Sequence, residues 1–218
     1  MSKNLIVILA LISCIPAYGQ DMLIEQIAGK EVVRKTFNDD KELTAKQVFK
    51  VGELQTTGNQ LSVQLQVSLF DEDGELEDKY LTKYTCEPGK SDVLLAVFPF
   101  ARQGNAEYVI EASSPGFKRL YDFDAGDKTL PDLSLEMSIE SGVLSFFGSK
   151  SVVAISDRIV STSSSGFTLT SRLTIKAYMW GLNVKTITYQ VREKLDKNRR
   201  LISQVFREEE GSYFLMNY

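Results

Sequence analysis

The sequence has no histidine among its 218 residues. This absence excludes Ser-His-Asp and Cys-His nucleophiles and histidine-ligated zinc, and it leaves no side chain whose ordinary pKa lies near neutrality. The sequence also has no G-x-S-x-G elbow, no phosphate-binding P-loop, no G-x-G-x-x-G and no Ser-x-x-Lys pair. We therefore predict that the protein is not an enzyme, assign it no catalytic or metal-binding residue, and expect no cofactor.

Cysteine is almost as scarce, with Cys14 and Cys86 as the two examples. If the chain is cleaved before Gln20, one cysteine remains and an internal disulfide is impossible. Cys86 follows Tyr80, Thr82 and Tyr84 on one face of a predicted strand. This setting indicates a buried structural thiol in preference to a reactive one.

Long apolar runs are also lacking. The run from Leu5 to Ile12 is too short to cross a bilayer. It follows Lys3 and precedes Ala17-Tyr18-Gly19, which places small residues where a signal peptidase reads them. We therefore predict a signal peptide over residues 1–19, cleavage before Gln20, and a soluble periplasmic or secreted protein in which residues 20–218 form one domain.

A second interpretation of the leader stays open. Leu11-Ile12-Ser13-Cys14 is similar to the lipobox at which bacterial lipoproteins are cut and acylated on the cysteine. If this site were used, the same domain would be anchored to the outer envelope by a lipid on Cys14. Soluble export is favoured by the small residues at the later cleavage site.

A dense patch of positive charge is absent too. The chain has 25 Lys and Arg against 29 Asp and Glu, for a formal net charge of −4. This balance argues against a nucleic-acid partner. The basic residues that do cluster surround a predicted turn and indicate a solvated hairpin tip: Lys194, Lys197, Arg199 and Arg200.

Alternation of apolar and polar residues is abundant. From Phe167 to Met179 every second residue is apolar except Ser171, and from Gln60 to Leu69 the alternation has no exception. Both stretches predict strands with one buried and one solvated face. At ~3.3 Å per residue the first would run roughly 40 Å, a length that suits a large, curved sheet.

Shorter segments of the same kind fill most of the remaining chain. Met22–Ile27 and Ser91–Phe100 leave helix and strand undecided, and Asp124–Asp132 indicates a loop. We predict an all-β fold of roughly ten to twelve strands with little helix: a large curled antiparallel sheet, as a β-roll or an open barrel. The further predicted strands are Glu31–Phe37, Gln47–Gly52, Leu76–Cys86, Ala106–Ala112, Phe117–Phe123, Leu133–Ile139, Ser151–Ser161, Val184–Glu193, Leu201–Glu208 and Ser212–Tyr218.

The carboxylates offer two candidate sites. Glu136 and Glu140 share a strand face and could form the pair that a glycoside hydrolase needs, although carboxylates at this spacing are usually solvent-facing. Acidic residues around Gly126 have the ligand chemistry of a calcium loop but lack the bidentate glutamate that usually completes one. Calcium binding therefore stays open against a plain solvated loop for Asp122, Asp124, Asp127 and Asp132.

Aromatic residues and one repeated pattern complete the candidates. Tyr178 and Trp180 lie at the end of a predicted strand, where they could stack on a sugar or pack under a loop. Phe70–Leu76 and Leu195–Leu201 share an apolar-Asp…Leu pattern that indicates either a duplicated hairpin or ordinary turn chemistry.

Several short motifs occur together in this chain: Ala17-Tyr18-Gly19-Gln20, Phe70–Leu76, Thr85–Lys90, Gly126–Asp132, Trp180-Gly181-Leu182 and the hairpin at Asp196. Together they resemble the TapB-like family of uncharacterised exported envelope proteins of Gram-negative bacteria. The resemblance spans most of Val48–Glu209, and it departs from the family after Asp196, where a Gly is usual. It implies a curled antiparallel β-roll without known enzyme activity or catalytic residues.

The sequence thus favours a non-enzymatic envelope protein that acts as a binding or assembly accessory through the concave face of its sheet. Its partner would be an envelope protein, a glycan or a lipid, and we expect no transmembrane segment after leader cleavage. One alternative is a carrier that holds a lipid or another apolar molecule inside a barrel. A glycoside hydrolase that uses a carboxylate pair is the third hypothesis.

Overall fold

The computed structural model describes residues 23–86, 107–112, 120–124, 126–139, 150–179 and 182–218, and nearly all of its regular structure is β-strand. One short helix, α1 (Leu23–Ile27), precedes the strands. The strands are β1 (Glu31–Phe37), β2 (Leu43–Val51), β3 (Gln55–Thr57), β4 (Gln60–Phe70), β5 (Leu76–Cys86), β6 (Glu107–Ala112), β7 (Leu133–Ile139), β8 (Lys150–Ser163), β9 (Gly166–Met179), β10 (Leu182–Leu195), β11 (Leu201–Arg207) and β12 (Tyr213–Asn217).

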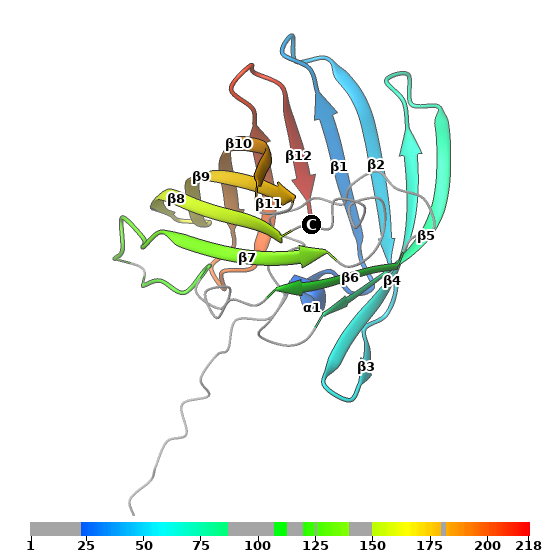
Figure 1. Ribbon diagram of the computed structural model, residues 1–218, viewed down its shortest axis with the longest axis horizontal. Helices are drawn as coiled ribbons and strands as arrows, with labels where there is room; N and C mark the ends of the chain where they lie inside the picture. The colour runs from blue at the N-terminus through cyan, green and yellow to red at the C-terminus, as the bar shows by residue number, and fades with distance from the viewer. Residues whose placement is uncertain (1–22, 87–106, 113–119, 125, 140–149, 180–181) are drawn as a thin grey trace, which may run out of the picture.

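All twelve strands belong to one curled sheet (Figure 1). Its order is β2-β1-β12-β11-β10-β9-β8-β7-β6-β5-β4-β3, and β2 pairs in addition with β4, so the order returns on itself. Every described pairing is antiparallel except β5–β6, which is parallel over three residue pairs. The predicted fold class, a large curled antiparallel sheet with little helix, is confirmed.

The inner face of the curl holds the core. In β4 the odd-numbered residues Leu61 to Leu69 are all buried, as the alternation predicts. In β9 the buried positions Leu169 and Leu173 flank Ser171, which is itself 8% exposed. Burial of each such aliphatic side chain contributes ~1.5–3 kcal/mol, so the inner face of the sheet supplies most of the stabilising surface.

Residues Leu23–Ile27 form a helix, which settles the choice between helix and strand for the described part of Met22–Ile27. Leu23, Ile24 and Ile27 of α1 are buried in the core, and the helix contacts β4. The side-chain oxygen of Gln26 accepts a hydrogen bond of 3.1 Å from the backbone amide of Leu201. This contact ties the first element to the start of β11.

The prediction of a strand over Phe117–Phe123 is wrong for its described part, 120–123, which is irregular. Leu120, Tyr121 and Phe123 are buried because the segment packs into the curl. Burial of alternate side chains from an irregular segment imitates a strand in the sequence. Strand β3 was not predicted, and Ser91–Phe100 lies outside the described residues.

Four hairpins share one five-residue turn, which explains the repeated pattern as turn geometry. In each turn the backbone amide of the first residue donates a hydrogen bond to the carbonyl oxygen of the fifth. The amide of the fourth residue donates to the carbonyl oxygen of the first. These N···O distances are 2.9–3.3 Å. The fourth residue has a positive φ in each case: Lys41, Gly74, Arg199 and Gly211. The turns span residues 38–42, 71–75, 196–200 and 208–212.

Candidate functional site

A buried polar cluster lies on the inner face, where β10 and β11 pair. The Oε1 atom of Glu193 accepts hydrogen bonds from the Tyr121 hydroxyl at 2.7 Å and from Gln204 Nε2 at 2.6 Å. The hydroxyl of Tyr218 donates to the Oε1 atom of Gln204. The cluster thus joins the irregular segment after residue 119, β10, β11 and the C-terminal residue.

Arg158 enters the same cluster from a β-bulge in β8. The register of β8 against β9 shifts between Ser156 and Ile159, and Asp157 takes a φ of 53°. The bulge turns Arg158 inward, where it is 5% exposed. Its guanidinium donates to the carbonyl oxygens of Pro131, at 2.8 Å, and Leu120, so it ties both residues to β8.

Burial governs the proton equilibria of the cluster. It raises the pKa of the Glu193 carboxyl above its ordinary value, while the two donated hydrogen bonds and the charge of Arg158 partly oppose the shift. Burial and the neighbouring Glu193 raise the pKa of Tyr121 well above its ordinary value. The adjoining cavity, lined in part by Ser171, measures about 20 Å³, which is room for about one water molecule. This geometry fits a structural network.

A second region lies where the sheet splits. Strand β10 pairs with β9 along its whole length, from Leu182 to Leu195, but with β11 over Gln190–Leu195 alone. The stretch from Leu182 to Tyr189 is therefore paired on one edge only, as far as the described residues extend. A bulge between Asn183 and Lys185 leaves Lys185–Tyr189 as the regular part of this edge.

An open groove of about 340 Å³ lies at the split. Its walls are Thr186, Ile187 and Thr188 from β10 and the glutamates 208–210 from the turn between β11 and β12. Tyr189 donates a side-chain hydrogen bond to Glu208 across the split. Burial, followed by the charge and hydrogen bond of Glu208, raises the pKa of Tyr189 to about 12. The Tyr189 hydroxyl therefore stays protonated and serves as a donor.

An aromatic cluster supports the floor of the split. Phe206 stacks on Phe214 with ring centroids 4.6 Å apart, and Tyr189 meets the two rings edge-on at 6.0 and 5.6 Å. The guanidinium of Arg34 lies over Phe214, 4.4 Å from the ring centre. These contacts fix the position of Tyr189 and, through its hydroxyl, of the glutamate turn.

The acidic residues that were candidates for calcium binding lie at the surface. Asp122, Asp124, Asp127 and Asp132 are all exposed. Asp127 Oδ2 accepts a 2.8 Å hydrogen bond from the backbone amide of Asp124, so loop geometry accounts for that carboxylate. Within the described residues no three acidic or cysteine side chains converge on a point where a metal ion could bind.

Other predicted candidates fall partly outside the described residues. Glu136 lies in β7 and Cys86 ends β5, but their side chains are not described, and Glu140 and Trp180 lie outside the described residues. Tyr178 is half-buried. The basic cluster Lys194, Lys197, Arg199 and Arg200 surrounds the turn 196–200, as predicted.

The cluster and the groove were both missed by sequence reasoning. A weak signal for Arg158 exists, because the buried positions of β8 change from odd (Val153, Ile155) to even (Val160), as a bulge requires. Glu193 likewise shares the odd-numbered positions of β10 with buried Val191. The groove has no such signal, because it depends on how far β11 pairs with β10.

No family model and no curated protein matches the chain, so the resemblance to the TapB-like family is not confirmed. Two solved structures are similar. The first, described as a "putative lipoprotein" from Parabacteroides distasonis, is 17% identical, with 90% of this chain and 96% of that chain covered at a TM-score of 0.45. The second, described as a "putative exported protein with YmcC-like fold" from Bacteroides fragilis, is 13% identical, with 87% and 93% covered at a TM-score of 0.41.

The described part of the chain contains no helix that is long and apolar enough to span a membrane.

Proposed function

We propose that this is an exported envelope protein that acts as a binding or assembly accessory and not as an enzyme. The observation that carries the proposal is the open groove of about 340 Å³ at the split between β10 and β11. It combines polar side chains with an edge of β10 on which no described strand pairs, and a partner can satisfy both the side chains and the backbone groups of such an edge.

The concave face itself is the less suitable surface in the described part of the molecule. Leu65, Leu173 and Phe206 lie on this face and are buried in the core. A partner would have to displace them. We therefore place binding at the rim of the curl, where the sheet opens.

The carrier alternative receives no specific support. A pocket that encloses a lipid or another apolar molecule has a volume of several hundred Å³. The cavity beside Glu193 in the core measures about 20 Å³. The groove is larger, but apart from Ile187 it is lined by threonines and glutamates, which do not suit an apolar ligand.

Photo-cross-linking in the native envelope tests the proposal. A photoreactive residue would replace one side chain at a time: Thr188 in the groove, or one of two exposed apolar side chains elsewhere, Leu81 on β5 and Ile202 on β11. A binding accessory should give a defined adduct with an envelope component from at least one of these positions. If none of the three full-length variants gives an adduct while each accumulates normally, the proposal is wrong.

A further inference from the structure

Three hairpin tips give one end of the curled sheet a strong negative charge. The turns 38–42, 71–75 and 208–212 contain three, four and three acidic residues with a single lysine, Lys41, for a formal charge of −9. The whole chain carries −4, so the remaining residues sum to +5. The negative charge of this protein is therefore concentrated in fifteen residues.

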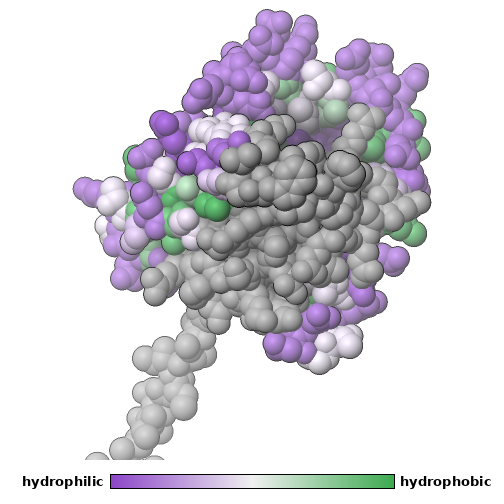
Figure 2. Space-filling model, in the orientation of Figure 1, coloured by the Kyte–Doolittle hydropathy of each residue, from purple (hydrophilic) through white to green (hydrophobic). Residues whose placement is uncertain are grey.

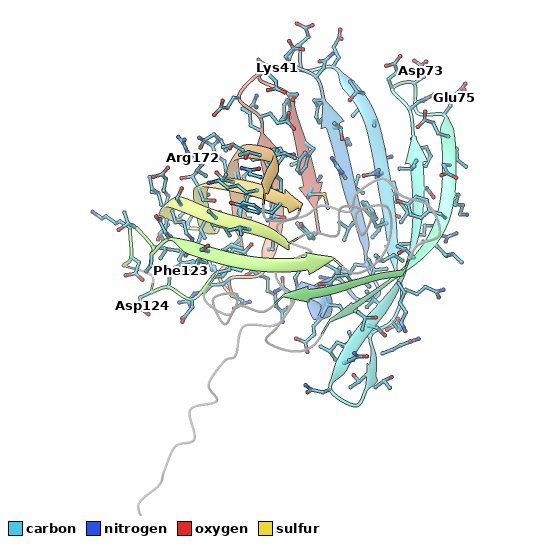
Figure 3. All side chains as sticks on the ribbon, viewed as in Figure 1. Lys41, Asp73, Glu75, Phe123, Asp124 and Arg172 are labelled. Carbon is cyan, nitrogen blue, oxygen red and sulfur yellow. The ribbon has the colours of Figure 1, made fainter. Side chains whose placement is uncertain are left out.

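The three tips lie at the same end because their strands are antiparallel neighbours. The order β11-β12-β1-β2-β4-β5 sends each of these hairpins to one end, while the basic turn 196–200 points to the other. Figure 1 shows the three tips together, and Figure 3 places Lys41, Asp73 and Glu75 there. Figure 2 shows hydrophilic residues gathered at this end.

The tip at 208–212 stands directly beside the open edge of β10. Glu208, Glu209 and Glu210 form one wall of the groove, and the edge residues Thr186–Thr188 form the other. Glu208 and Glu210 lie so close that burial, their mutual hydrogen bond and their like charges raise the pKa of Glu208. A cation from a partner would relieve this repulsion.

The edge of β10 can pair with an added strand. Residues Lys185–Tyr189 are regular β-structure with one ladder partner in the described residues. Backbone groups on such an edge pair readily with an added extended segment, which gains main-chain hydrogen bonds. The bulge between Asn183 and Lys185 shortens the edge, so the added segment would span about five residues, roughly 17 Å.

We propose that an extended, lysine- or arginine-containing segment of a partner protein adds as a strand to β10 along Lys185–Tyr189 and places its basic side chains against Glu208–Glu210. This inference rests on the proposed binding function and specifies its partner. The edge supplies main-chain pairing, and the acidic end steers a basic segment toward it. A second copy of this chain fits less well, since it would bring a second acidic end to the same place.

The first test measures binding of two short, end-blocked peptides to the mature protein by titration calorimetry. In one peptide lysine alternates with valine, and in the other glutamate replaces each lysine. The lysine peptide should bind, with an affinity that falls as salt is added, and the glutamate peptide should not. Equal binding of both peptides, or binding of neither, overturns the proposal.

Matched variants then locate the site. The triple variant E208Q/E209Q/E210Q should weaken binding of the lysine peptide about tenfold, since it removes the exposed ion pairs of Glu209 and Glu210 and the half-buried one of Glu208. The control E72Q/D73N/E75Q removes three charges from the same kind of turn at the same end, away from the β10 edge, and should have much less effect. Equal losses of peptide affinity in the two variants would mean that the negative charge of the whole acidic end attracts the peptide, without a site at β10, and the proposal would be wrong.

Hydrogen exchange tests the strand itself. Amides on the free edge of Lys185–Tyr189 should exchange quickly in the free protein and slowly with the lysine peptide bound. A lysine peptide whose backbone is N-methylated at alternate residues should give no such protection. Edge amides already protected in the free protein would mean that another segment or a second copy covers the edge, which overturns the inference.

The photo-cross-linking positions separate this inference from the proposed function. An adduct from Thr188 supports both. Adducts from Leu81 or Ile202 without one from Thr188 would keep the binding function and overturn the β10 edge as its site.

Discussion

Glu193 shows how one buried residue sets a property of the whole molecule. Its side chain is 7% exposed, and a single oxygen accepts the hydrogen bonds of Tyr121 and Gln204. Gln204 in turn holds the hydroxyl of Tyr218. A loop, two strands and the C-terminus therefore depend on one acceptor.

The pH dependence of stability follows from the raised pKa of Glu193. The folded state holds the Glu193 proton at pH values where the unfolded state has lost it. The free energy of unfolding therefore falls as pH rises from the ordinary value of 4.5 through the folded pKa. In E193Q, which keeps the accepting oxygen but cannot ionise, we expect this decline to flatten in urea unfolding measured across that range.

The control for this prediction is E31Q, because Glu31 is exposed and begins β1. E31Q should retain the decline. If E193Q and the unchanged protein show the same slope against pH, the buried carboxyl does not control it.

The four hairpin turns share one geometry but differ in the residue at their fourth position, so they can be compared directly. All four turns need a positive φ at their fourth residue, yet Lys41 and Arg199 have side chains there. The left-handed conformation costs a residue with a Cβ ~1–2 kcal/mol. Arg199 recovers part of this cost, because its guanidinium lies 4.9 Å from the centre of the Phe123 ring.

We predict that K41G stabilises the protein by ~0.5–1 kcal/mol in urea unfolding, since glycine adopts a φ of 68° without strain but has more freedom to lose on folding. R199G should gain less, because it also loses the contact with Phe123. The opposite change, G74A, should cost ~1 kcal/mol. A loss of stability in K41G would contradict this account of the turn.

Gly166 tests the packing of one hairpin against the next. It begins β9 with a φ of 145°, and a Cβ at this position would lie 2.1 Å from the carbonyl oxygen of Leu195 at the end of β10. Because the obstacle is backbone, relief requires the strands to separate. We predict that G166A costs ~3 kcal/mol or more in urea unfolding.

Gly126 provides the comparison, since a Cβ there would meet nothing within 4 Å. G126A should change the free energy of unfolding by less than ~0.5 kcal/mol. Similar effects of the two substitutions would show that the close approach of Gly166 to β10 carries little energy.

The elements were largely predictable because the alternation in β4 and β9 is a direct record of one buried face. Prediction from alternation failed at residues 120–123, where an irregular segment buries alternate side chains. It also did not reveal that the bulge in β8 turns Arg158 inward. The buried cluster could not be predicted, since Tyr121 and Glu193 lie 72 positions apart and meet through the curl of the sheet.

At the scale of the molecule, strand order decides where the charge lies. The acidic turns 38–42, 71–75 and 208–212 are spread along the sequence, and a prediction of strands alone leaves their relative positions open. Antiparallel order gathers them at one end beside the β10 edge. The candidate binding surface is thus a product of topology, which the local pattern does not encode.

The mass of the molecule tests both the predicted cleavage of the leader and the absence of a large ligand cavity in the described core. We predict that native mass spectrometry of the protein, purified gently from its own envelope fraction, gives the mass of the chain that starts at Gln20. No excess of a few hundred daltons should disappear on denaturation, because the cavity in the core has room for about one water. An excess of that size would support the carrier function instead. A denatured mass that fits an acylated Cys14 would place the acidic end and the β10 edge on a lipid anchor, where a partner must approach from the side of the membrane or across the space above it.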